Sequence, residues 1–313
     1  MIEKRDYFGR INYIISSDSL SVSVIDYGCT CLSIKLNGRE LTLGLDSLDE
    51  YIKDKCHLGV IVGRYGNRIE GARCWIGNKE VVLESNEGCN QLHGGPKGFD
   101  KKIWTVTSVN ELDHGGSVRF ECLSPDGENG YPGNLRASVT YEVDGNNMYI
   151  YWGGISDADT IYAPTTHMYF NLGGEQDILK TKVRMCSDTY LAVNDQLIPT
   201  EICNVDKYFD FREKREIQNP YDHCFIINEN KPEDEPAFEA ESNGVCMSIW
   251  TDYPGLQFYT GKKLRAPHHA FQGFAIEPEA YPNSPNRNDF PSSVLKANVN
   301  YTRYVKYCFT ENN

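Results

Sequence analysis

The stretch LRASVTYEV, residues 135–143, decides the fold class because its apolar and polar residues alternate without a break. Every second residue is apolar, and the residues between them are Arg, Ser, Thr and Glu. This period of two is typical of a β-strand with one buried face and one face in water. Similar runs return along the whole chain as SLSVSV (19–24), SVRFEC (117–122), NMYIYW (147–152) and GVCMSIW (244–250).

Turn dipeptides separate these strand patterns. Asn-Gly, Gly-Asn and Asp-Gly pairs favour tight hairpin turns, and they stand at 37–38, 77–78, 126–127, 129–130, 144–145 and 243–244. Only DSLDEYIKDK (46–55) shows helical spacing, with Ser47 and Glu50 placed for a capping box. Many strands, few short helices and no convincing linker predict an all-β fold, a single large antiparallel β-sandwich domain over residues 1–313.

The composition narrows the classes of partner and compartment. The net charge is -13, which repels nucleic-acid backbones and anionic lipid, so we expect neither nucleic acid nor a membrane as partner. The N-terminal MIEKRDYFGR has no apolar core of a signal peptide, and the 11 cysteines are odd in number and scattered. We therefore expect mostly buried free thiols and a reducing, cytoplasmic setting.

Several signatures of cofactor and metal chemistry are missing from the sequence. It contains no P-loop, no dinucleotide glycine fingerprint after a strand, no H-E-x-x-H and no G-x-S-x-G. Cys29 and Cys31 form a lone C-x-C without the second pair that a structural zinc site needs. We expect a protein without cofactor or metal, in which any reaction uses side chains alone.

Two glycine-rich stretches hold candidate site residues. GRYGNRIEG (63–71) carries Asn67 and Arg68, whose hydrogen-bonding forks suit hydroxyl groups, although a tight loop with solvated arginines gives the same pattern. QLHGGPKGFD (91–100) carries His93, and an imidazole in a Gly-Gly-Pro loop is difficult to explain as core filling. Of the two stretches, the second favours function more strongly.

Three further candidates lie beside apolar strand patterns. His167 in APTTHMYFNL (163–172) has aromatic neighbours that suit either a core or a sugar-stacking wall. Asp222 in YDHCFII (221–227) is equally well explained as a turn residue. Gln257 in PGLQFYTG (254–261) lines either a groove or the solvent face. Taken singly, none of these three decides between function and structure.

Glu277 is the most informative acidic residue. In GFAIEPEAYPNSPN (273–286) it follows an apolar approach, where desolvation raises a carboxyl pKa and makes the carboxylate a better base. The structural alternative is a salt-bridge partner at the end of a strand. Glu279 lies two residues on, roughly 6.6 Å away between Cα atoms of an extended strand, and such a pair of acids also suggests a glycosidase.

Taken together and in order, these stretches resemble the aldose 1-epimerase (galactose mutarotase) family. The resemblance runs from about Tyr7 to Phe309 and includes YFGRINYIISSDSLSVSVIDYGCTCLSI (7–34), SPDGENGYPGN (124–134), QLIPT (196–200) and DFR (210–212). It implies a large twisted β-sandwich of the galactose mutarotase type. It also implies interconversion of the α and β anomers of free hexoses such as galactose and glucose, with a small sugar as substrate of a monomer or homodimer.

The resemblance also assigns roles to individual residues. Glu277 is similar to the catalytic base of the family, His167 to its acid, and His93 to the second histidine near the ring oxygen. There are two departures: Thr166 stands where members often have Asn, and Glu279 near where many carry Gln. The positions similar to those that hold the sugar hydroxyls are Asn67, Arg68, Asp222 and Gln257.

Three alternative functions stay open on the sequence. A non-catalytic carbohydrate-binding β-sandwich would keep the hydroxyl-binding residues but does not need a Glu with two histidines. A glycoside hydrolase or lyase would use Glu277 together with Glu279. An epimerase acting on a hexose phosphate is the third, and we favour a free sugar because the sequence shows no matching arginine cluster.

Overall fold

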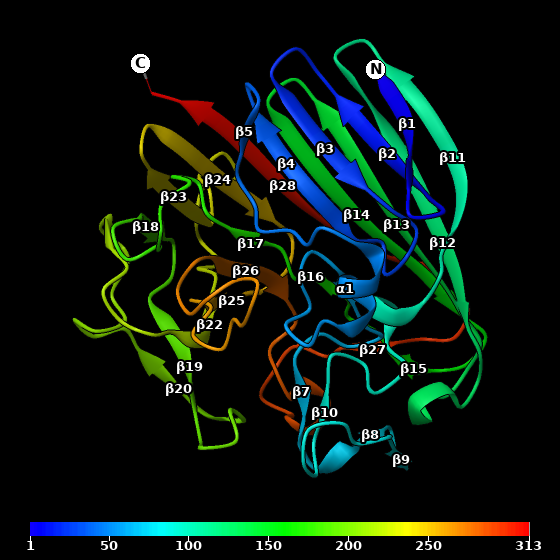
Figure 1. The fold of residues 1–313 in the computed structure, drawn as a ribbon. Helices are drawn as coiled ribbons and strands as arrows, with labels where there is room; N and C mark the ends of the chain where they lie inside the picture. Colours follow the sequence, from blue (N-terminus) through cyan, green and yellow to red (C-terminus); the bar gives the residue numbers. More distant parts are fainter. Residues whose placement is uncertain (313) are drawn as a thin grey trace.

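The computed structural model describes residues 1–312, and nearly all of its regular secondary structure is antiparallel strand (Figure 1). The stretch 135–143 lies in β13 (Leu135–Asp144), where all five of its apolar side chains are buried and Arg136 is exposed. The pleat sends alternate side chains to opposite faces, so the apolar set meets the core. The predicted all-β fold is confirmed.

The largest sheet has nine strands and forms the long wall of the molecule. Its order is β11-β12-β13-β14-β28-β24-β23-β18-β21, and every neighbouring pair is antiparallel. The C-terminal strand β28 lies between β14 and β24 and so joins the two halves of the sheet. The strands are β11 (Thr105–Leu112), β12 (Gly115–Ser124), β13, β14 (Asn147–Ser156), β18 (Lys182–Met185), β21 (Arg215–Glu216), β23 (Phe238–Ser242), β24 (Val245–Thr251) and β28 (Tyr301–Glu311).

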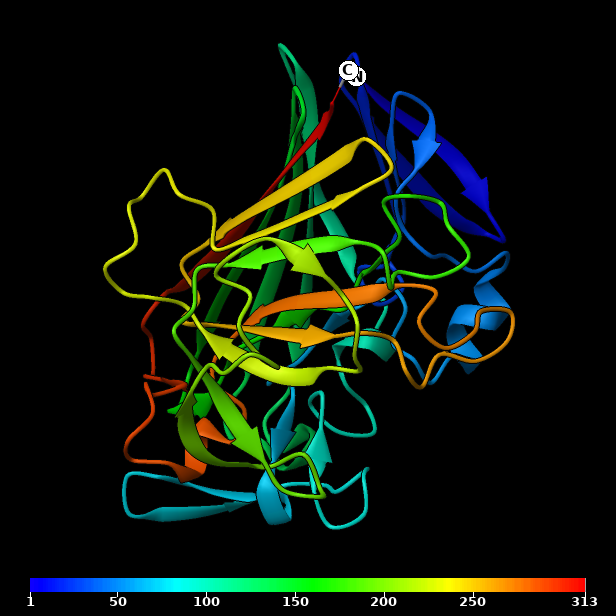
Figure 2. The same ribbon diagram turned by 90° about the vertical axis from the view of Figure 1, so that its left-hand side faces the viewer.

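Two smaller sheets pack on this wall and make the sandwich. One core cluster takes buried side chains from all three sheets, for example Ile15, Phe120 and Phe274. Figure 2 shows the six-stranded sheet crossing in front of the long strands. The N-terminal sheet is β1 (Ile2–Tyr7), β2 (Arg10–Ser16), β3 (Leu20–Val24), β4 (Cys31–Leu36) and β5 (Arg39–Glu40). The six-stranded sheet, in spatial order, is β17 (Tyr169–Phe170), β26 (Phe274–Glu279), β25 (Gly255–Tyr259), β22 (Asp222–Ile226), β19 (Thr189–Val193) and β20 (Pro199–Asn204).

Short strand pairs and one helix complete the fold. The predicted helix is α1 (Leu48–Lys53), and the capping box between Ser47 and Glu50 is confirmed. Within residues 1–312, no helix has the length and apolar character needed to cross a membrane. The pairs are β6 (Ile61–Val62) with β16 (Thr165–Thr166), β7 (Arg68–Ile69) with β10 (Gln91–Leu92), β8 (Arg73–Ile76) with β9 (Lys79–Val82), and β15 (Thr160–Ile161) with β27 (Val294–Leu295). Single 3-10 turns span Glu70–Ala72, Phe99–Lys101, Glu128–Gly130 and Ser284–Asn286.

Strand β26 is buried at all six of its positions, so both of its faces meet protein. It lies inside the six-stranded sheet, between β17 and β25. Phe274 and Ile276 face the large core. Because side chains alternate along a strand, Glu277 and Glu279 share the opposite face. The sheet therefore places two carboxyl groups side by side away from the apolar core.

The cysteines correct one sequence-based expectation. All eleven are free, but only Cys29, Cys31, Cys74 and Cys224 are buried, so the expectation that most are buried was wrong. Cys246 lies in β24 between two buried residues and therefore points to the opposite, more open face of its strand. The same alternation that builds the core keeps such thiols partly exposed.

Arg64 is a buried structural residue, although its loop stretch 63–71 suggested either a polar clamp or solvated arginines. Its side chain is 2% exposed. Its guanidinium donates six hydrogen bonds, to the backbone carbonyls of Ser124, Pro125, Pro132 and Gly133 and to the hydroxyls of Ser124 and Thr160. Arg64 thus holds the loop after β12 against β15.

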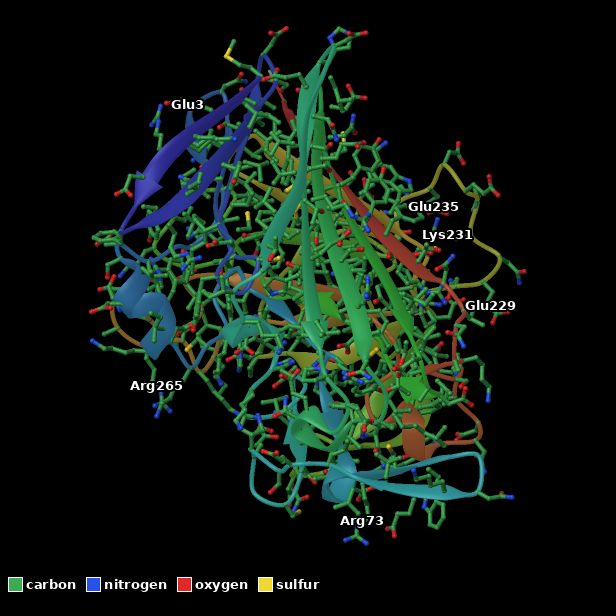
Figure 3. All side chains as sticks on the ribbon, turned by 90° about the vertical axis from the view of Figure 1, so that its right-hand side faces the viewer. Glu3, Arg73, Glu229, Lys231, Glu235 and Arg265 are labelled. Atoms are coloured by element: carbon green, nitrogen blue, oxygen red, sulfur yellow. The ribbon has the colours of Figure 1, made fainter. Side chains whose placement is uncertain are left out.

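We expect Arg64→Met to lower the free energy of unfolding by about 3–5 kcal/mol, because the change leaves several buried carbonyls without a donor. Urea denaturation measures this loss. The matched control is Arg73→Met: Arg73 points outward (Figure 3) and its side chain is 61% exposed in a surface pair with Glu80. The control is expected to cost less than about 1 kcal/mol. Equal losses in the two variants would contradict the structural role of Arg64.

Candidate active site

One pocket collects every site residue that the sequence predicted. The contributing segments are separated by up to 210 positions in the chain, from Asn67 to Glu277, and the fold brings them together. Asp222 is half-buried, and the other six residues are 7% exposed or less. The seven pocket residues are Asn67, Arg68, His93, His167, Asp222, Gln257 and Glu277.

The register of three neighbouring strands fixes one side of the pocket. Gln257 in β25 stands directly opposite Glu277 in β26, and Asp222 opens β22 on the other side of β25. Facing pairs in antiparallel strands point to the same face of the sheet. The alternative that Gln257 faces solvent is wrong, because this side chain is 4% exposed.

Glu277 and His167 form the centre of the site. The Nε2 atom of His167 lies 3.7 Å from the Oε1 atom of Glu277, and the two side chains are 6% and 3% exposed. The second carboxylate oxygen of Glu277 and the Nδ1 atom of His167 have no partner within the described chain. A buried carboxylate and imidazole with unsatisfied polar atoms are equipped to exchange protons with a bound molecule.

The glycines around His93 allow a close approach of two loops. A Cβ atom on Gly94 would lie 1.9 Å from the carbonyl oxygen of Gly63, so only glycine fits there. The Nδ1 atom of His93 accepts a hydrogen bond from the backbone N–H of Asn67 at 3.1 Å. An accepting Nδ1 places the proton of a neutral imidazole on Nε2. The loop therefore holds His93 as a hydrogen-bond donor, and its ring lies 5.3 Å from that of His167.

Burial favours the uncharged forms of the central groups. Desolvation, and secondarily the carboxylate of Asp222, raises the pKa of Glu277 well above its ordinary value, as the sequence predicted. Desolvation, and secondarily His57, lowers the pKa of His167 to about 3 and that of His93 well below its ordinary value. The pocket therefore favours protonated Glu277 beside neutral His167, and the pair holds one proton between its two members.

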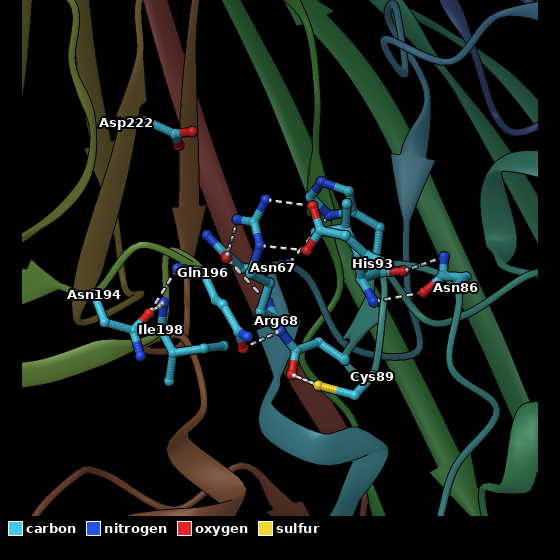
Figure 4. Close-up of polar contacts among 12 residues, drawn as sticks. Asn67, Arg68, Asn86, Cys89, His93, Asn194, Gln196, Ile198 and Asp222 are labelled. Atoms are coloured by element: carbon cyan, nitrogen blue, oxygen red, sulfur yellow. Dashed lines mark hydrogen bonds and ion pairs between the residues drawn. The ribbon is translucent and has the colours of Figure 1, made fainter.

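Arg68 is fixed by a carboxylate that the sequence did not single out. Its Nε and Nη2 atoms donate to the two oxygens of Glu87 at 2.6 and 2.8 Å, a bidentate pair. Figure 4 shows Arg68 beside Asn67, and the backbone N–H of Arg68 donates to the Asn67 side chain at 2.9 Å. Asn67 is 3% exposed and Arg68 is 7% exposed. The interpretation of a tight loop with solvated arginines is therefore wrong for Arg68.

Asp222 and Gln257 form a second polar group in the pocket. The Nε2 atom of Gln257 donates to Asp222 at 2.7 Å, while the Oε1 atom of Gln257 has no partner in residues 1–312. The carboxylate is thus oriented, and an acceptor is left over for a ligand. Together with Arg68, these residues offer donors and acceptors of the kind that hydroxyl groups use.

Glu279 lies behind the pocket wall, fully buried. Its Oε1 atom accepts a hydrogen bond from the side chain of Asn67 at 3.1 Å, and Oε2 has no partner among the described residues. Desolvation, and secondarily Glu277, raises its pKa well above the ordinary value. Glu279 does not line the pocket, so the two acids do not face a common substrate as the paired acids of a glycosidase do. Thr166, the other departure, is also buried, and its hydroxyl makes no hydrogen bond within the described chain.

The two histidines and Glu277 also deserve a test as metal ligands. Donor atoms of His93, His167 and Glu277 lie within 4.8 Å of one another. Tetrahedral zinc with bonds of about 2.0–2.1 Å needs donors about 3.4 Å apart, and the His167–Glu277 separation of 3.7 Å already exceeds this. The donor atoms are thus spaced somewhat wider than bound zinc requires, and the expectation of no metal stays a prediction.

Two pocket residues, His57 and Glu87, had no distinct signal in the sequence, and Tyr169 was indicated only as one of the aromatic neighbours of His167. Tyr169 packs against His167 with ring centroids 5.0 Å apart, and His57 lies beside both His93 and His167. Glu87 anchors Arg68. Each sits in an ordinary polar or apolar context along the chain, and only the fold brings it to the pocket.

The chain matches known proteins over nearly its full length. The family model described as aldose 1-epimerase matches residues 12–308. The galactose mutarotase of Sus scrofa is 33% identical, over 95% of this chain and 93% of that protein. The aldose 1-epimerase of Escherichia coli (strain K12) is 32% identical, over 96% of this chain and 95% of that protein.

Solved structures show the same fold. The galactose 1-epimerase from Lactobacillus acidophilus NCFM superposes with a TM-score of 0.90 at 28% identity, over 100% of this chain and 99% of that chain. An aldose epimerase homologue from C. elegans gives a TM-score of 0.89 at 28% identity, over 96% of this chain and 99% of that chain. The galactose mutarotase type of β-sandwich expected from the sequence is confirmed, and the chain belongs to the aldose 1-epimerase family.

Proposed function

We propose that this isomerase interconverts the α and β anomers of free hexoses such as galactose and glucose. The observation that carries the proposal is the buried pair of Glu277 and His167, 3.7 Å apart, with a donor atom of His93 within 4.8 Å. Anomer exchange needs an acid and a base on neighbouring oxygens of one hemiacetal. This pair supplies both without a cofactor.

The reaction opens and closes the sugar ring. Glu277, as carboxylate, takes the proton from the C1 hydroxyl while His167 gives one to the ring oxygen O5, and the C1–O5 bond breaks. The aldehyde turns about C1–C2, and closure from the other face reverses both transfers. His93 donates its Nε2–H to O5 and stabilises the charge that develops there. Each positioned acid or base contributes about 10²–10⁴-fold to the rate.

The remaining pocket residues hold the sugar while its ring is open. Arg68 and Asn67 donate to hydroxyl groups from one side, and Asp222 and Gln257 bind them from the other. Fixing these hydroxyls keeps the open chain in place while the aldehyde turns, which lowers the entropic part of the barrier. The bidentate contact of Arg68 with Glu87 supports this role.

One observation favours a hexose phosphate as an alternative substrate. Three basic side chains, Lys55, Lys263 and Arg265, lie at the edge of the pocket. All three are exposed, and exposed basic residues alone attract anions only weakly through water and salt. A free hexose therefore remains the proposed substrate.

Polarimetry tests the proposal directly. Catalytic amounts of the protein, added to freshly dissolved α-D-galactose, are expected to raise the first-order rate of approach to equilibrium rotation in proportion to protein concentration. Buffer with heat-inactivated protein is the control, because bases catalyse the spontaneous reaction. An unchanged rate despite sugar binding would identify a carbohydrate-binding protein instead. Release of reducing sugar from an oligosaccharide would identify a hydrolase.

We also propose that residues 1–313 act as one domain, supported by a core cluster that runs from Tyr13 to Phe309. The cytoplasmic setting and the monomer or homodimer stay predictions.

A further inference from the structure

His57 is a third imidazole in the pocket wall. It follows α1 in the chain, and its ring centroid lies 4.8 Å from that of His93 and 5.8 Å from that of His167. Its backbone φ of 58° lies in the left-handed region, which L residues rarely adopt. The surrounding structure therefore holds this side chain in a specific place.

A buried carboxylate orients the ring of His57. Its Nδ1 atom lies 3.3 Å from the Oδ2 atom of Asp100, whose side chain is 7% exposed. A carboxylate beside Nδ1 favours the tautomer with the proton on that nitrogen. In the neutral ring with this tautomer, Nε2 is the hydrogen-bond acceptor and is directed away from Asp100. The pocket thus combines one donating imidazole, His93, with one accepting imidazole, His57.

Three of the pocket side chains differ in depth. The side chain of His57 is 19% exposed, that of His167 is 6% exposed, and Glu277 is 3% exposed. The basic residues Lys55 and Arg265 also line the pocket and are exposed. The series from Glu277 through His167 to His57 therefore runs from the floor of the pocket toward its mouth.

The proposed function fixes how a pyranose lies along this series. With the C1 hydroxyl at Glu277 and O5 at His167 and His93, the next ring atom beyond O5 is C5, which carries the exocyclic C6 hydroxymethyl group. This group then extends past the two inner imidazoles. His57 is the side chain that stands against both of them.

We propose that His57 is a specificity-determining residue that accepts a hydrogen bond from the C6 hydroxyl of the bound hexose. This inference rests on the proposed function and adds a substrate preference to it: sugars that carry a hydroxyl on C6 are favoured over those that lack it. Asp100 acts as the positioning residue that holds His57 in the accepting tautomer.

A cycle of one residue and one hydroxyl tests the proposal. Polarimetry gives kcat/KM for D-galactose and 6-deoxy-D-galactose with wild type and with His57→Asn, which tolerates the left-handed backbone. Wild type is expected to prefer galactose by roughly fivefold to tenfold, the value of one hydrogen bond. His57→Asn is expected to lose this preference by losing activity on galactose alone. The amide of Asn also accepts hydrogen bonds but is one methylene shorter, whereas His57→Gln carries its acceptor further from the backbone and is expected to retain part of the preference.

The matched control is His114→Asn, at an exposed histidine in the turn between β11 and β12, which is expected to leave both values unchanged. Equal losses on the two sugars in His57→Asn, or a wild type that does not discriminate between them, would overturn the inference while leaving the proposed function intact. A wild type inactive on both sugars would overturn the proposed function itself. Thermal melting of each variant shows that it is folded.

Discussion

Glu277→Gln is expected to lower turnover by about 10²–10⁴-fold, because it removes the only proposed proton acceptor for the C1 hydroxyl. The amide has nearly the same shape and fills the same buried place in β26, so sugar binding is expected to persist. The neighbours proposed to hold the sugar, Asp222 with Gln257 and Arg68 with Glu87, are paired independently of Glu277. Polarimetry gives the turnover, and titration with galactose gives the affinity.

The stability of this variant separates catalysis from folding. Burial raises the pKa of Glu277 in the folded state, so its contribution to stability is fully present below the unfolded pKa of about 4.3 and is lost as the pH rises through the folded pKa. Glutamine does not ionise. Glu277→Gln is therefore expected to match wild type near pH 4 and to be the more stable protein at alkaline pH, as thermal melting at both values shows. Near-normal turnover in this folded variant would reject Glu277 as the base.

The fold was predictable because most strands keep one face in the core. In β13 the alternation alone gives the strand and its buried face. Strand β26 shows the limit of this reasoning, because all six residues are buried and no alternation of exposure distinguishes its two sides. There the direction of Glu277 follows only from its neighbours in the sheet.

The candidate site was predictable where glycine marked it and where whole stretches resembled a family. Gly94 lies so close to the backbone of Gly63 that no side chain fits there. The glycines of this loop indicated a functional role for His93. Arg64 also lies in a glycine-rich stretch, 63–71, yet its side chain binds a loop in the interior and not the pocket. His57 and Glu87 carried none, because their roles arise from residues distant in the chain. Period and motif describe one segment at a time, whereas a pocket is made by several.

The protonation states of Glu277 and His167 were the property of the site that was hardest to predict from the sequence. From the sequence, Glu277 was assigned as a carboxylate base and His167 as an imidazolium acid. In the structure both side chains are buried, and burial disfavours the charged forms of Glu277 and His167. A pair that holds one proton has the same total charge whether Glu277 or His167 carries that proton. In the proposed mechanism, activity therefore follows the number of protons that the pair holds and not the charge of either residue alone.

His167→Asn is expected to lower kcat/KM at neutral pH by about 10²–10⁴-fold and to change the shape of its pH profile. In wild type the active pair holds one proton. Activity is expected to fall at acidic pH, as His167, whose pKa burial lowers to about 3, takes a second proton. It is also expected to fall at alkaline pH, as the pair loses its proton through the raised pKa of Glu277.

Without the imidazole, the residual activity of His167→Asn depends only on Glu277 as a free carboxylate. Its rate is therefore expected to rise with pH over the alkaline range in which the wild-type rate falls, so the slope changes sign. Polarimetry between about pH 2.5 and about pH 9, with the spontaneous rate subtracted at each value, measures both profiles, including the acidic fall near the lowered pKa of His167. Should the variant keep the falling alkaline limb of wild type, that limb belongs to a group outside the pair, and the shared proton between Glu277 and His167 is not the one that drives ring opening.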